Sequence, residues 1–228
     1  MSGIVWPYRN RLLVSSLALV VVLFGGCGLL GVFGGSVEDA GGLTRFEVRK
    51  LSLEEEYQLL SERYTLMENK LEEAQLVIHD GIWEWGGGDT LPLMGIHGPT
   101  GIQGGTSENC YYIEATRRIF PEGAVGAVED LDPMIEYAKS KEWEYAFQDM
   151  SSGTRLRIAT DDRWLFMYEV QKNGQYNLSI YSDVYWTNDT YDLLMAVGER
   201  MTPDYEDGTQ YFPNESLPGE YVPFPKWD

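Results

Sequence analysis

A hydrophobic run from Leu12 to Gly34 constrains this chain more than any other feature. It holds 23 residues without a charged side chain, and a helix of that length spans the hydrocarbon core of a bilayer. Arg9 and Arg11 precede the run, whereas no basic residue occurs between Gly35 and Thr44. Because nearby basic residues stay on the cytoplasmic side, the sequence predicts a short cytoplasmic or interior N-terminus (residues 1–11), a transmembrane helix (12–34) and an extracytoplasmic remainder.

The same run allows a second interpretation, a secretory signal that is removed. Gly25-Gly26-Cys27 resembles the end of a lipoprotein signal, in which Cys27 is lipidated after cleavage. The apolar stretch continues through residues 28–33, where a cleaved lipoprotein turns polar, and this favours an uncleaved helix. Cys27, Gly31 and Gly35 recur every four residues and form a possible helix-pairing face, although glycine is also simply frequent in membrane helices.

After a linker (residues 35–45), a heptad pattern predicts an amphipathic or coiled-coil stalk helix over residues 46–79. Its apolar positions alternate in steps of four and three, and the predicted oligomer seam is Leu53, Tyr57, Leu60, Tyr64, Met67, Leu71, Ala74 and Ile78. In a parallel pair of such helices, Arg63 of one copy faces Glu68 of the other. The seam therefore indicates a possible homo-oligomer, and the alternative is a helix packed against its own domain.

The charge balance excludes some classes of partner. The chain has 36 acidic and 17 basic side chains, a formal net charge of −19 and a pI near 4.4. Such a surface repels nucleic acid, so we expect no nucleic-acid partner; the expected partners are the lipid bilayer and other protein subunits. The acidic excess and the preference for arginine over lysine are also typical of halophilic proteins.

Cysteines and sequons agree with an extracytoplasmic position. Cys110 is the only cysteine outside the hydrophobic run, so no internal disulfide is expected, and Cys110 is either buried or bridges two copies. Three Asn-x-Ser/Thr sequons mark possible glycosylation at Asn177, Asn188 and Asn214. All three lie in the part of the chain predicted to be outside.

The remainder predicts an α+β fold, with a small antiparallel-sheet head and flanking helices over residues 110–201. Residues 80–109 are glycine-rich and are expected to connect stalk and head. The head is expected to contain a helix or strand (111–119), a helix (132–148), three strands (155–160, 164–171 and 175–183) and a last helix (191–201), with a hairpin turn at Asn173-Gly174.

An extended tail rich in proline and aromatic residues follows (residues 202–228). Its possible partner-contact residues are Tyr211, Phe212, Tyr221, Phe224 and Trp227. Such a tail can wrap a neighbouring subunit or pack across its own head.

Catalytic and cofactor motifs are not evident, so we expect no enzyme, no cofactor and no metal. The two histidines, His79 and His97, lack tight metal-ligand spacing to neighbouring acids or to Cys110. The close acids at residues 129–132 and 161–162 are unremarkable in a chain with 36 acids, and the second pair falls in a predicted turn.

Together these patterns predict a non-enzymatic, single-pass, membrane-anchored surface protein. It would act as a structural or interaction subunit of a cell envelope or of a membrane-containing virion. The alternative is an exported lipoprotein or tethered ligand-binding module, lipidated at Cys27, with Trp83 and Trp85 as the aromatic ligand site. A tethered hydrolase using two carboxylates is a third interpretation.

Overall fold

The computed structural model describes residues 37–86, 88–95, 101–201 and 212–227. These residues belong to one compact unit, Val37–Asp228, which combines an antiparallel sheet with a few helices. The expected α+β class is therefore confirmed. The predicted transmembrane helix and its pairing residues Cys27, Gly31 and Gly35 lie outside the described residues. None of the described helices is long and apolar enough to cross a bilayer.

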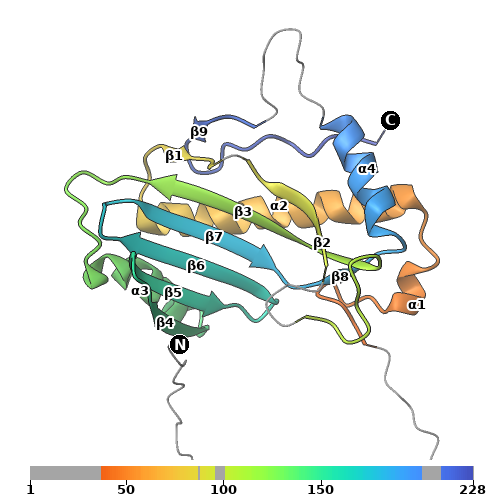
Figure 1. Ribbon diagram of the computed structural model, residues 1–228, viewed down its shortest axis with the longest axis horizontal. Coiled ribbons are helices and arrows are strands. Elements are labelled where there is room, and N and C mark those ends of the chain that lie inside the picture. Colours follow the sequence, from red (N-terminus) through yellow and green to blue (C-terminus); the bar gives the residue numbers. More distant parts are fainter. Residues whose placement is uncertain (1–36, 87, 96–100, 202–211, 228) are drawn as a thin grey trace, which may run out of the picture. The chain divides into compact units, whose positions relative to one another are not determined.

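The described strands form one antiparallel sheet (Figure 1). Its main path runs in the order β4-β5-β6-β7-β3-β1-β9, and β2 and β8 also pair with β3. The strands are β1 (Trp83–Glu84), β2 (Thr90–Met94), β3 (Cys110–Ile119), β4 (Glu144–Asp149), β5 (Gly153–Ala159), β6 (Trp164–Gln171), β7 (Tyr176–Ser182), β8 (Tyr185–Trp186) and β9 (Glu215–Ser216).

The central strands show the period of two that a sheet with one covered face requires. In β3 and β7 buried residues alternate with half-buried ones. The β6–β7 hairpin turns where Asn173-Gly174 predicts it, because Gly174 adopts φ +84°, a left-handed conformation that glycine takes without steric cost. The three strands predicted after residue 150 agree with β5, β6 and β7, and the 111–119 segment is a strand.

The helices are α1 (Arg45–Val48), α2 (Leu53–Ile78), α3 (Asp132–Ser140), which follows a short 3-10 turn, and α4 (Thr190–Arg200). Helix α2 begins with a capping box in which the Ser52 side chain accepts from the Glu55 amide and the Glu55 carboxylate accepts in return. Asp189 caps α4 by accepting from the amides of Tyr191 and Asp192.

The predicted helix over 132–148 is wrong in its second half. It ends at Ser140, and Glu142 adopts φ +60°, which reverses the chain before β4. The aromatic residues Trp143, Tyr145 and Phe147 alternate with polar or small ones, which suits an edge strand better than a helix.

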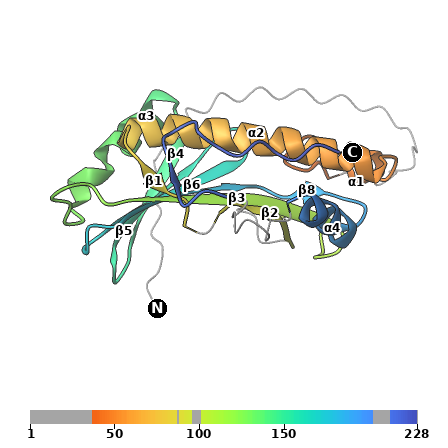
Figure 2. The same ribbon diagram turned by 90° about the horizontal axis from the view of Figure 1, so that it is seen from above.

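Helix α2 is not a separate stalk. It lies along one face of the sheet together with α3 (Figure 2), and the predicted seam is used inside the chain's own core. Six of its eight residues are at most 1% exposed, namely Tyr57, Leu60, Tyr64, Met67, Leu71 and Ala74. Leu53 is partly exposed and Ile78 packs at the core's edge. The structure thus agrees with the alternative interpretation, in which the helix packs on its own domain. The same apolar stripe would serve either for pairing with a second helix or for packing on a sheet.

The predicted boundaries between stalk, connector and head are corrected for the same reason. The 80–109 segment is not a bare connector, since it contributes β1 and β2 to the sheet. The described tail runs along α2 (Figure 2), and its β9 pairs with β1. Helix, connector, head and described tail therefore share one core.

Candidate functional site

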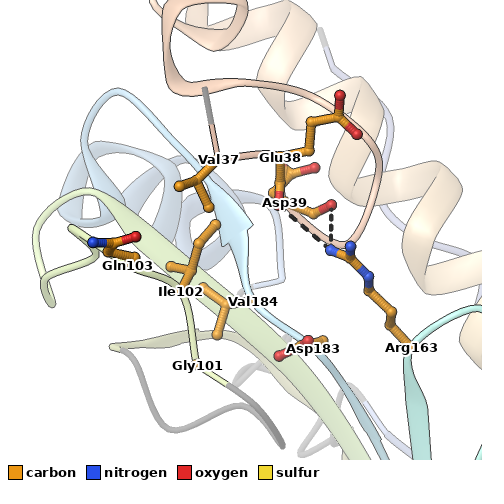
Figure 3. A pocket seen from close by; sticks show the side chains of 9 residues that line it. All are labelled: Val37, Glu38, Asp39, Gly101, Ile102, Gln103, Arg163, Asp183 and Val184. Atoms are coloured by element: carbon orange, nitrogen blue, oxygen red, sulfur yellow. Dashed lines mark hydrogen bonds between the residues drawn. The ribbon is translucent and has the colours of Figure 1, made fainter. Parts of the chain in front are cut away.

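A cavity of about 310 Å³ lies beside the first described residues (Figure 3). Four segments that are distant in sequence meet there: the start of the unit, residues 101–103, the turn between β5 and β6, and the link between β7 and β8. The lining residues are Val37, Glu38, Asp39, Gly101, Ile102, Gln103, Arg163, Asp183 and Val184. Apolar side chains of Val37, Ile102 and Val184 form one wall, and charged groups form the other.

Arg163 organises the charged wall. It adopts φ +64° in the β5–β6 turn, an uncommon conformation for a residue with a Cβ. Its Nη1 atom donates to the carbonyl oxygen of Asp39 at 2.9 Å, and its own carbonyl oxygen accepts from the Asp183 amide at 2.9 Å. Arg163 therefore ties the start of the unit to the β7–β8 link.

Asp39 is almost fully buried, and its carboxylate is used for structure. It accepts from the amides of Gly41, Leu43 and Trp186 at 2.8 to 3.0 Å, and it lies 3.8 Å from Nη2 of Arg63. Arg63 in turn lies over the Tyr185 ring at 3.9 Å. The sequence pairs Arg63 with Glu68 of a second helix, and this is wrong, because Arg63 contacts residues of its own chain.

The lining combines an apolar wall with charged groups, a composition that small-ligand sites also have. Its possible chemical groups are the carboxylates of Glu38 and Asp183 and the guanidinium of Arg163, and it includes no serine, cysteine, threonine or histidine. Sequence reasoning missed this cavity, because its residues come from four separate segments and form no motif.

A second cluster of charges lies under α2. Arg117 is 1% exposed, and its guanidinium donates to Asp89 at 2.6 Å and to both Glu68 oxygens at 3.1 and 3.2 Å. The Tyr64 hydroxyl group shares its one proton between Asp89, at 3.2 Å, and the Val222 carbonyl oxygen, at 3.0 Å. The centre of the Trp85 ring lies 3.7 Å from the guanidinium carbon. We call Tyr64, Glu68, Asp89 and Arg117 the buried charge cluster.

Burial, and then the neighbouring Asp89, raise the pKa of Glu68, and although Arg117 opposes both effects the pKa reaches about 9. A pKa raised in this way favours the protonated acid at neutral pH, which leaves one carboxylate opposite one guanidinium. Two converging carboxylates are what a hydrolase needs. Glu68 and Asp89, however, are at most 9% exposed and are bonded to Arg117, so this geometry stabilises the fold and offers no access to a substrate.

The other acids singled out from the sequence are separated. Asp162 forms an ion pair with Lys70 at 2.7 Å and accepts from Thr160. Asp130 accepts from the Tyr176 hydroxyl group. Within the described part of the chain, no group of three His, Cys, Asp or Glu side chains is placed to hold a metal ion.

Histidine, cysteine and tryptophan side chains are placed as follows. His79 is the C-cap of α2, and His97 lies outside the described residues. Cys110 is buried and donates to the Thr106 carbonyl oxygen, so it cannot bridge two copies in this conformation. Trp83 and Trp85, the predicted aromatic ligand site, are at most 1% exposed, and their indole groups donate to His79 and Ser216. They belong to the core.

The three sequons differ in accessibility. Asn214 is exposed beside β9, and Asn177 lies half-buried on β7. The Asn188 side-chain nitrogen donates to Glu56 and to the carbonyl oxygens of Val48 and Leu51. Since that nitrogen is the atom to which a glycan is attached, Asn188 is occupied by structural contacts. Glycosylation at the three positions stays a prediction.

The predicted partner-contact residues of the tail pack on α2. Phe224 and Trp227 lie with their ring centroids 5.1 Å from that of Tyr57, and Tyr221 lies 6.0 Å from Tyr64. Phe212 stacks on Trp85 at 5.4 Å. Tyr211 lies outside the described residues. These contacts agree with the interpretation in which the tail packs across its own domain.

Comparison with protein-family models finds no match, and neither does comparison with curated proteins or with solved structures.

Proposed function

We propose that this chain is a non-enzymatic, single-pass membrane protein whose extracytoplasmic domain acts as a structural or interaction subunit of an envelope or of a membrane-containing virion. The proposal rests on two features, the hydrophobic run at 12–34 and the contacts that hold the first residues of the domain. It comprises a membrane anchor, a domain without an evident catalytic group, and contacts with other protein subunits.

The observation that carries the proposal is the attachment of the first described residues. The Val37 carbonyl oxygen accepts from the Trp186 indole at 3.1 Å, and the Ala40 amide donates to Val184 at 3.0 Å. Only Gly35 and Ser36 lie between the predicted membrane run and Val37. Since each residue spans at most about 3.5 Å, such a helix would be joined to a firmly held part of the fold by a short connection.

A short, firm attachment fits a subunit that must be positioned. A long flexible linker would leave the height of the domain above the bilayer variable, whereas a short connection fixes that height, as a subunit of an assembly requires. Helix α2, which packs on the sheet, does not act as a spacer. The domain would therefore work close to the membrane surface.

The test is crosslinking mass spectrometry on native membranes or particles, with the intact mass of the chain read from the same sample. We expect an uncleaved N-terminus and crosslinks from the domain to a second protein subunit. A mature chain that begins at a lipidated Cys27, without crosslinks to other subunits, would contradict the proposal and favour the lipoprotein alternative.

The cavity favours a second function, capture of a small ligand by the tethered domain. Its lining carries the acids Glu38 and Asp183 and the base Arg163 beside an apolar wall, so acidic side chains are in excess. A small ligand with an apolar part and a positive charge fits this chemistry best. A thermal-shift series with short aliphatic diamines tests it, and an unchanged melting temperature at millimolar diamine would count against it.

A further inference from the structure

One edge of the sheet is open in the described structure. β4 stands at the end of the strand order, and β5 is its only strand partner among the described residues. Natural edge strands are commonly protected by lysine, proline, a bulge or a covering segment. The six residues of β4, Glu144–Asp149, contain no lysine and no proline, their two charged residues stand at the two ends of the strand, and their pairing with β5 runs without a register shift.

The alternation of hydrogen-bonded and non-bonded pairs along the β4–β5 hairpin shows which backbone groups of β4 face away from β5. Met150 and Gly153 exchange both backbone bonds, at 2.9 and 3.3 Å. Since bonded and non-bonded positions alternate along an antiparallel pair, Ala146 and Gln148 also direct their backbone groups to β5. The N–H and C=O groups of Tyr145 and Phe147 therefore point to the open edge, where no described residue bonds to them.

The side chains at this edge are aromatic and exposed. Tyr145 is 37% exposed and Phe147 is 51% exposed, and their rings meet edge to face at 6.0 Å. They lie opposite Ile158 and Leu156 of β5, two core residues. Tyr145 and Phe147 therefore project from the helix-bearing face of the sheet and extend its apolar layer to the edge.

We propose that two copies of this chain pair through β4, antiparallel, around a two-fold axis at Ala146. Because only the odd-numbered residues direct backbone groups outward, such a pair must join odd to odd positions. The register centred on Ala146 places Tyr145 of each copy opposite Phe147 of the other, with two main-chain hydrogen bonds at each of these pairs. The sheets then continue into one another, with the helices of both copies on the same face.

The sequence of β4 is self-complementary in this register. Two aromatic cross-strand pairs form on the helix-bearing face. On the opposite face Glu144 lies opposite Gln148 twice and Ala146 lies opposite itself, so no like charges are directly opposed. A register shifted by two residues sets Tyr145 opposite either itself or Asp149, and both Tyr145–Phe147 pairs are lost.

Net charge sets the conditions under which the pair forms. Arg9 and Arg11 are the only charged side chains before Val37, so the 15 basic and 36 acidic side chains that follow give residues 37–228 a formal charge of −21. Two such domains repel at low ionic strength, and salt screens this repulsion because the Debye length falls from about 10 Å at 0.1 M to about 3 Å at 1 M. Pairing of the two copies should therefore strengthen as the salt concentration rises. The proposed pairing involves described residues only and does not depend on the proposed membrane anchor.

Cysteine crosslinking tests the register directly. In a full-length Cys27→Ser background in detergent micelles at 1 M NaCl, Ala146→Cys places two thiols on the axis. The Cα atoms of directly opposed, non-bonded residues are about 4.5 Å apart, within the range for a disulfide. Gln148→Cys is the matched control, because two copies of residue 148 are offset by four residues, about 13 Å along the strands.

We expect mild oxidation to convert most of the Ala146→Cys chain, and little of the Gln148→Cys chain, to a covalent dimer. Equal crosslinking of the two variants, or crosslinking of neither, would overturn the proposal. Phe147→Lys should abolish the Ala146→Cys crosslink by placing a charge on the edge. Phe120→Lys makes the same change at a residue that is 54% exposed elsewhere, and it should leave the crosslink unchanged; equal loss in both variants would also overturn the proposal.

Discussion

Arg117 shows how a single residue organises this fold. It is a buried cation on β3, and its ligands come from α2 and from the segment before β2. A buried charge is tolerated only when it is paired and hydrogen-bonded. Asp89 supplies the opposite charge, and a protonated Glu68 supplies a neutral acceptor. The cluster thus fixes the position of the helix against the sheet through polar geometry in addition to apolar packing.

The protonation of Glu68 predicts a pH-dependent stability. Its pKa is about 9 in the folded chain, because burial and Asp89 disfavour the charged form, against an ordinary value of 4.5. The folded state therefore holds a proton that the unfolded state has lost between these values. The contribution of Glu68 to the free energy of unfolding is fully present below about pH 4.5. As the pH rises, this contribution falls by up to about 1.4 kcal/mol per pH unit, and it is lost above about pH 9.

Urea unfolding at several pH values between 5 and 9 measures this slope. Glu68→Gln keeps the shape and a neutral amide in place of the protonated acid, so we expect it to flatten the pH dependence by one proton while preserving stability at pH 7. Glu136→Gln is the control, since Glu136 is an exposed partner of Lys139. An unchanged slope in Glu68→Gln would show that Glu68 is ionised in the fold.

At the scale of elements, α2 lies between the sheet and the described tail. Its inner side meets β3 and β7, and Tyr57 and Tyr64 contact the tail at two further points: their hydroxyl groups donate to the Pro225 and Val222 carbonyl oxygens, both at 3.0 Å. Phe224 lies between the two tyrosine rings, 5.1 and 5.6 Å from their centroids. The tail therefore completes the burial of a helix that the sheet covers only in part.

Phe224→Ala should lower the free energy of unfolding by about 1–3 kcal/mol, because it removes a half-buried ring from two aromatic contacts. Urea unfolding followed by tryptophan fluorescence measures the loss. Lys226→Ala changes an exposed neighbour and should stay within about 0.5 kcal/mol of the parent chain. Equal stability of the two variants would mean that the tail does not pack on α2 in solution.

The elements that the sequence predicts well are those with strong local signals. Asn173-Gly174 predicts the β6–β7 hairpin, and the aromatic and β-branched residues of 164–171 predict β6, and both agree with the structure. The heptad stripe of α2 correctly predicts a helix with one apolar side. It does not distinguish a second helix from a sheet as the covering surface, since both require the same burial.

Local sequence signals of this kind could not predict the candidate site. Arg163, Asp183 and the 101–103 segment come together only because the β5–β6 turn, the β7–β8 link and the start of the unit meet at one end of the sheet. The buried charge cluster likewise joins Arg117 to residues 28 and 49 positions away in the sequence. Long-range pairings of this kind leave no periodic trace in the sequence.

At the scale of the whole molecule, the dominant property is its charge. Residues 37–228 carry a formal charge of −21, and the described structure has few ion pairs to offset it. Self-repulsion of this size destabilises the compact state relative to the expanded chain. Screening by salt relieves the repulsion, so salt should stabilise the compact state.

The melting temperature should therefore rise between 0.05 and 2 M NaCl, with most of the increase below about 0.5 M, where screening changes fastest. Sucrose is the matched control, because it stabilises by exclusion from the protein surface without screening charge. Scans of the Phe147→Lys variant at two protein concentrations separate this effect from pairing through β4, since association makes the melting temperature depend on concentration. A melting temperature that is flat in salt would show that the acidic surface is not under electrostatic strain, and the halophilic interpretation would fall with it.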